Sequence, residues 1–66
     1  MTVKIDKARL LALMDKKGYT PIRISRMSEL TRYTVYKAMA GDIVSMKTVI
    51  KIASVLSVDY TEIICS

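Results

Sequence analysis

The stretch 20–41, TPIRISRMSELTRYTVYKAMAG, limits the fold of this chain more than any other part of it. Thr20 and Pro21 form a typical helix start, because a threonine hydroxyl can cap the first turn and proline is tolerated where the amide hydrogen would have no partner. Thr31 is a second N-cap, and 28–30 would form the turn between the two helices. The stretch therefore predicts two short helices in close succession.

Three more helices are predicted around this stretch. Asp6 is a suitable N-cap for a first helix that runs to about Lys17, and Ser45 is one for the fourth helix. Asp59 and Glu62 fit a capping box and predict a short last helix. Apolar residues recur at helical spacing, and those expected to face the core are Leu10, Leu13, Met14, Ile24, Met27, Val35, Ala38, Val49, Ile52, Ala53, Leu56, Ile63 and Ile64. The expected class is all-α, with one domain, 1–66, of five short helices.

The first residues, 1–5, form a possible extended arm. The β-branched Val3 and Ile5 alternate with polar neighbours, which is a short strand-like pattern. Because a single strand is not stable alone, the arm would need a partner, and a second copy of the chain is one candidate.

Composition argues against several classes of protein. A chain of 66 residues makes one domain, and 52% hydrophobic residues are typical of a globular protein. The single Cys65 cannot form an internal disulfide, and without histidine no familiar zinc site is present. No apolar run approaches the ~20 residues of a membrane span, and the N-terminal MTVKIDKARL lacks the apolar segment of a secretory signal. We expect a cytoplasmic protein with no metal or other cofactor and no membrane contact.

The groups that catalysis needs are also missing. The chain has no histidine, no pair of carboxylates on one helical face and no glycine-rich phosphate loop. We therefore do not expect an enzyme. So short a chain also leaves little room for a small-molecule pocket, and no such ligand is expected.

The charge of the chain is positive and unevenly distributed. Eleven basic against six acidic residues give a net charge of +5, which suits a polyanionic partner. Between Tyr19 and Lys37 there are four basic residues and only Glu29 is acidic, whereas the chain from Ile52 onward has Asp59 and Glu62 and no basic residue. The two helices of the central stretch therefore belong to the positive side of the molecule.

Two motifs occupy the two halves of the chain. The residues from Thr20 follow the pattern T-P-x-x-I-S-x-x-S-x-L-T-R-x-T-V-x-K-x-x-x-G, and those from Val44 follow V-S-M-K-T-V-x-K-I-A-x-x-L-x-V-D. In this order and separation they resemble the Cro/C1-type helix-turn-helix family, also called XRE-like, over roughly residues 10–64. The resemblance implies a lambda-repressor-like helix-turn-helix domain with its core at 20–41. It also implies double-stranded DNA and a second copy of the chain, in a homodimer, as partners.

In that family the start of the second motif helix enters the major groove of DNA. The resemblance implies contacts with bases for Thr31, Arg32, Tyr33, Tyr36 and Lys37. It implies contacts with phosphates for Thr20, Arg23, Thr34, Ser45 and Lys47. Arg32 is the best candidate for bidentate recognition of guanine, and Tyr36 has the alternative of packing against the turn.

The sequence departs from the family pattern at three positions. Pro21 stands where a glutamine usually bonds a phosphate, so this contact must come from Thr20 or from later amides. Ser25 replaces the usual small alanine. Glu29 replaces the glycine of the turn, where a left-handed backbone would cost ~1 kcal/mol or more.

Two functions remain open at this point. The first is a sequence-specific, DNA-binding transcriptional regulator, a repressor or phage-type control protein that binds an operator through the major groove. The second is a protein-binding module, an antirepressor or antitoxin-like partner, that keeps the helix-turn-helix fold and uses its apolar surface on another protein. Salt-dependent binding to duplex DNA distinguishes them.

Overall fold

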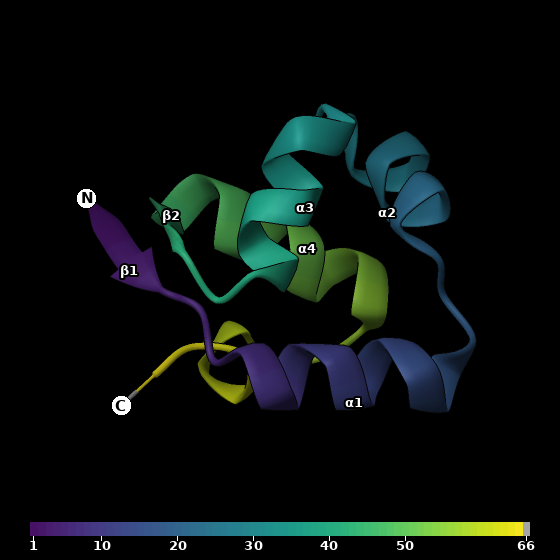
Figure 1. Cartoon of the computed structure of the whole chain (residues 1–66), viewed down its shortest axis with the longest axis horizontal. Coiled ribbons are helices and arrows are strands. Elements are labelled where there is room, and N and C mark those ends of the chain that lie inside the picture. Colours follow the sequence, from purple (N-terminus) through teal and green to yellow (C-terminus); the bar gives the residue numbers. More distant parts are fainter. Residues whose placement is uncertain (66) are drawn as a thin grey trace.

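The structure, a computed structural model, describes residues 1–65 and contains in that range four α-helices, two short strands and one 3-10 helix. In chain order the elements are β1 (Thr2–Lys4), α1 (Lys7–Lys17), α2 (Pro21–Ser28), α3 (Arg32–Met39), β2 (Ile43–Ser45), α4 (Met46–Leu56) and the 3-10 helix η1 (Tyr60–Glu62). Helix α3 lies between α2 and the small sheet, with α1 below it and α4 behind it (Figure 1). None of the helices in this range is long and apolar enough to cross a membrane.

The α-helices begin at the caps that the sequence predicts. A backbone N–H group of the first turn donates to the side-chain oxygen of each cap at 3.1–3.3 Å. The four caps are Asp6, Thr20, Thr31 and Ser45. Because each cap satisfies an amide that the helix itself leaves without a partner, these short helices have defined first turns.

The turn between α2 and α3 contains Glu29 in the left-handed conformation, with φ at 61°. Two serines of α2 hold this turn. The hydroxyl of Ser25 donates to the carbonyl oxygen of Leu30 at 2.6 Å, and the hydroxyl of Ser28 accepts from the amide of Leu30 at 3.3 Å while donating to the carbonyl of Ile24. These hydrogen bonds offset the backbone strain of Glu29, which a glycine at this position would not have.

The core takes side chains from almost every element. Its buried apolar members are Ile5, Leu10, Met14, Ile24, Val35, Ala38, Val44, Val49, Ile52, Ala53, Leu56 and Ile63. The prediction for Met27 was wrong, because this side chain is 52% exposed. Helix α2 turns Ile24 and Ser28 inward instead, and these two residues are four apart on one face.

A small antiparallel sheet distinguishes the structure from the predicted all-α class. Strand β1 pairs with β2, which places Thr2 opposite Ser45, Val3 opposite Val44 and Lys4 opposite Ile43. The predicted arm therefore exists, but its partner is a distant part of the same chain and not a second copy. In β2 the side chain of Val44 is buried and its two neighbours are exposed.

The predicted fifth α-helix is a 3-10 helix of three residues, η1. The predicted capping box is present, with Asp59 accepting from the amide of Thr61 and Glu62 accepting from the amide of Asp59. The helix stops there because the chain that follows bonds to the N-terminal segment. Ile63 accepts from the amide of Asp6 at 2.9 Å, and residue 64 forms a bridge with residue 5.

Candidate nucleic-acid interface

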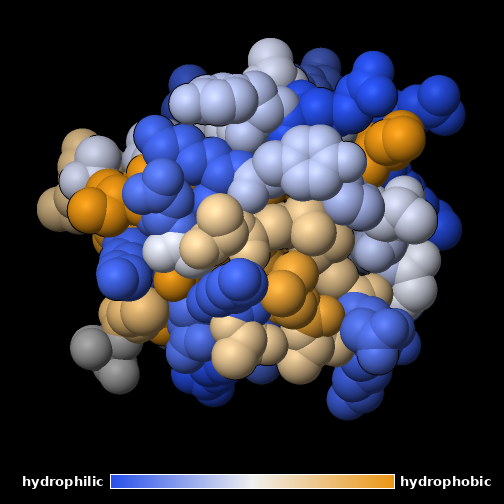
Figure 2. All heavy atoms as spheres, viewed as in Figure 1, coloured by the Kyte–Doolittle hydropathy of each residue, from blue (hydrophilic) through white to orange (hydrophobic). Residues whose placement is uncertain are grey.

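Helix α3 buries one side and exposes the other. Val35 and Ala38 are 1% and 0% exposed and face the core. Arg32 is exposed at the start of the helix, and the rings of Tyr33 and Tyr36 are 76% and 52% exposed. Hydrophilic side chains gather over α2 and α3 along the upper edge of the molecule (Figure 2). Long side chains with polar tips therefore extend from α3 into solvent.

The first turn of α3 carries a pair of hydroxyl groups. Thr31 accepts from the backbone amide of Thr34 at 3.3 Å, and the two side-chain oxygens lie 3.0 Å apart and share a hydrogen bond. One hydroxyl hydrogen of the pair is used in this bond, so one is left to donate to a ligand. Thr34 and Lys37 are half-buried, unlike the other predicted base-contacting and phosphate-contacting residues, which are exposed.

The start of α2 presents a hydroxyl and a guanidinium group. Thr20 accepts from the amide of Arg23 at 3.2 Å, which leaves the hydroxyl hydrogen of Thr20 free to donate. The guanidinium carbon of Arg23 lies 4.7 Å from the ring centroid of Tyr19. A cation over an aromatic face is attracted by the ring and restricted in its motion. The stacked ring therefore holds the positive charge of Arg23 close to the first turn of α2.

Tyr19, which contacts the candidate phosphate-binding Arg23, is a residue that the sequence interpretation missed. It lies outside the predicted helices, four residues before Arg23, and that spacing was the available signal. The spacing is informative only once the bend at Thr20 is known, because it is this bend that brings the ring beneath the guanidinium group.

At the start of α4 the hydroxyl of Ser45, a predicted phosphate contact, is already used in hydrogen bonds within the protein. The hydroxyl of Ser45 accepts from the amide of Thr48 at 3.1 Å and donates to the hydroxyl oxygen of Thr48 at 2.9 Å. The amide of Met46 donates to the carbonyl of Met1 at 3.0 Å. Since these hydrogens are used within the protein, the exposed ammonium group of Lys47 is the stronger donor at this end of the interface.

The ten predicted residues lie at the starts of α2 and α4 and along α3, where Tyr36 and Lys37 are one turn beyond the start of the helix. None of the ten side chains is buried. Helix α3 contacts both α2 and β2, so it lies in the middle of this group (Figure 1). The arrangement can present one helix to a partner and donate from both flanks of that helix.

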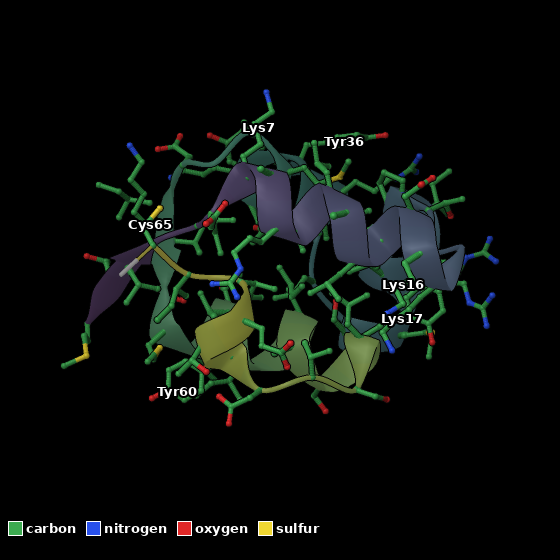
Figure 3. The ribbon with its side chains drawn as sticks, turned by 90° about the horizontal axis from the view of Figure 1, so that it is seen from below. Lys7, Lys16, Lys17, Tyr36, Tyr60 and Cys65 are labelled. Atoms are coloured by element: carbon green, nitrogen blue, oxygen red, sulfur yellow. The ribbon has the colours of Figure 1, made fainter. Side chains whose placement is uncertain are left out.

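A shallow hollow of about 260 Å³ lies elsewhere, between α4 and η1. Its lining residues are Ile50, Ala53, Ser54, Val58, Asp59 and Tyr60. Tyr60 and Tyr36 lie on opposite sides of the molecule (Figure 3). The hollow is therefore separate from the exposed face of α3. Within residues 1–65 no group of three or more His, Cys, Asp or Glu side chains could hold a metal ion.

Comparison with known proteins assigns this geometry to a family. The family model described as a Cro/C1-type HTH DNA-binding domain matches residues 9–65. The comparisons with curated proteins and with solved structures gave no match. The family match extends over both motifs, the turn at Glu29 and η1, and it confirms the resemblance seen in the sequence. The chain belongs to the Cro/C1-type helix-turn-helix family and is a DNA-binding domain of the kind found in regulators.

Proposed function

We propose that this protein is a sequence-specific repressor that binds double-stranded DNA at an operator, with α3 in the major groove. The observation that carries the proposal is the outer side of α3, where Arg32, Tyr33 and Tyr36 are exposed above a buried side. A helix with side chains, ~10–12 Å wide, fits a major groove of ~12 Å. Repression follows from occupying the site and excluding the polymerase.

The side chains of α3 read the bases in this proposal. Arg32, exposed at the first helical position, forms two hydrogen bonds with one guanine. Tyr33 offers its ring to a thymine methyl group, and Thr31 donates its remaining hydroxyl hydrogen. Lys37 and Tyr36 follow one turn later and contact the next base pairs.

The flanking helix starts bind the backbone of the DNA. At α2 the donors are the hydroxyl of Thr20 and the stacked guanidinium group of Arg23, which together replace the missing side-chain donor at Pro21. At α4 the donor is Lys47, and Ser45 contributes mainly by capping the helix that carries Lys47. Such contacts fix the position of α3 in the groove without reading the sequence.

A homodimer is the form in which we expect the protein to act. The hollow between α4 and η1 supports this view, because Ile50 and Tyr60 are 51% and 37% exposed at a surface that the proposed DNA contacts do not use. A two-fold contact there would place the same patch of both copies together and leave both α3 helices free. The dimer would bind two half-sites about one helical turn apart.

The test is a selection of duplex DNA from a random pool, followed by affinity measurements on the selected site between about 50 and 200 mM salt. With about five phosphates engaged, log affinity should fall against log salt with a slope near −4 to −5. A palindromic consensus would support the dimer. No detectable duplex binding at low salt would contradict the proposal, and co-purification of a protein partner would then favour the protein-binding module.

A further inference from the structure

The small sheet brings the N-terminal segment to the proposed DNA-binding side. Lys4 lies opposite Ile43, only a few residues before the start of α4. Side chains alternate across a strand, and in β1 Thr2 and Lys4 are exposed whereas Val3 is half-buried against the core. Lys4 therefore shares the outward face of the sheet with Ile43 and Ser45, at the end of the ladder that follows α3.

Four lysines from three separate segments surround the connection between α3 and α4. Lys4 is paired with Ile43, and the β-carbon of Lys7 would be only 3.0 Å from a β-carbon added at Gly41. The other two are Lys37, whose carbonyl accepts from the amide of residue 42, and Lys47. The pairing of β1 with β2, the hydrogen bond from the amide of Ile5 to the carbonyl of Asp42 and the packing of α1 on α3 bring residues 4 and 7 to this connection.

The nearby carboxylates point at backbone amides. Asp42 accepts from the amide of Ile43 at 2.7 Å, and Asp6 accepts from the amide of Arg9 at 3.2 Å. Each of these carboxylates keeps its negative charge, so the four lysines and the two carboxylates leave an excess of positive charge around the connection. The charge around the connection is thus basic in space although the N-terminal lysines are distant from Lys47 in the sequence.

Pairing with β1 also occupies backbone amides of this connection that could otherwise have donated to a phosphate. The amide of Met46 is taken by Met1, and Val44 is paired with Val3 in the ladder. A strand laid along the connection would weaken phosphate binding there unless it supplied donors of its own. Lys4, on the outward face of that strand, is such a donor.

We propose that β1 and the first turn of α1 form an additional phosphate-binding segment, in which Lys4 and Lys7 contact DNA phosphates beside the connection between α3 and α4. This inference rests on the proposed function, because it extends the same interface. Lys7 projects from the same side of the molecule as Tyr36, and Tyr60 lies on the opposite side (Figure 3). The exposed face of α3 and the N-terminal segment can therefore meet one duplex.

The test compares Lys4→Gln and Lys7→Gln with Lys16→Gln. All three changes remove one positive charge from an exposed side chain, and Lys16 lies at the end of α1 away from the sheet (Figure 3). Each glutamine keeps the β-carbon and γ-carbon, so the contact of Lys7 with Gly41 is retained. Affinity for the selected duplex is measured at several salt concentrations, and thermal melting confirms that each variant is folded.

Each N-terminal variant should lower the salt slope by about one unit. The affinity advantage of the wild-type protein over the variant should therefore shrink about 3.5-fold when salt rises from about 50 to 200 mM. Lys16→Gln should leave the slope unchanged, and Lys4→Arg should restore it at position 4.

The inference is overturned if Lys4→Gln and Lys7→Gln behave like Lys16→Gln while the wild-type protein binds the duplex with a steep salt slope. In that case β1 only supports the fold, and the proposed function stands. If the wild-type protein does not bind duplex DNA at low salt, the proposed function fails first and takes this inference with it.

Discussion

Replacing Glu29 by glycine should stabilise the protein. Glu29 is exposed and sits at φ 61° in the turn between α2 and α3. A residue with a β-carbon loses roughly 1–2 kcal/mol in this conformation, and glycine does not. Glycine also makes the unfolded chain more flexible, which costs about 0.4–1 kcal/mol. The difference predicts a net stabilisation of Glu29→Gly by about 0.5–1 kcal/mol.

The matched control is Glu29→Ala, which removes the same charge but keeps the β-carbon. Thermal melting of the two variants isolates the backbone effect, because the electrostatic effect is common to both. A difference of about 1 kcal/mol corresponds to about 4–8 °C in a domain of this size. Both variants should bind duplex DNA more tightly than the wild-type protein, and to the same degree, because each removes a negative charge from the positive side.

The reasoning is refuted if the glycine variant melts at or below the temperature of the alanine variant. Such a result would mean that the hydrogen bonds of Ser25 and Ser28 stabilise the turn so strongly that its left-handed residue carries no strain. In that event the difference in melting temperature between glycine and alanine at position 29 should appear in double variants that also carry Ser25→Ala.

Three other substitutions test the core and the interface. Leu56→Ala should lower the free energy of unfolding by about 2–5 kcal/mol, because Leu56 is 0% exposed, and unchanged denaturant melting would contradict its place in the core. Arg32→Ala should lose about 1–3 kcal/mol of discrimination at one base pair, whereas Lys47→Ala should weaken binding to all sequences and lower the salt slope by about one unit. Equal losses on every duplex would contradict this division of roles. Tyr19→Leu should weaken DNA binding about two- to fivefold, the equivalent of a surface cation–π contact. It should have no further effect in a protein that already carries Arg23→Gln, and an equal loss in that background would mean that Tyr19 acts through packing.

The sequence predicted those parts of the structure that depend on neighbouring residues. A cap needs only a side chain and an amide two or three residues later, and for this reason Asp6, Thr20, Thr31 and Ser45 were identified correctly. The spacing of apolar residues in α4 likewise identified its buried face. The exposed face of α3 followed from the same periodicity, since a helix that buries one side must expose the other.

Contacts between distant residues could not be predicted in this way. The pairing of Lys4 with Ile43 joins two short segments, and each of them taken separately is ambiguous between a strand and a loop. Met27 was assigned to the core because apolar spacing does not reveal that a serine can take the inward position. The stacking of Arg23 on Tyr19 joins a residue of α2 to one in the connection before it, and the path of that connection is not given by local spacing.

The N-terminal segment 1–6, which contains β1, is joined by backbone hydrogen bonds to the start of α4 and to residues 63 and 65. Within the residues described, the amide of Met46 donates to Met1, the amide of Cys65 donates to Lys4, and the amide of Asp6 donates to Ile63. Local opening of the whole segment 1–6 would break these three bonds in one event, since each of them has one partner in the segment. Hydrogen exchange at the N-terminal end, at the start of α4 and at residue 65 should therefore be governed by a single opening equilibrium, although these amides are far apart in the sequence.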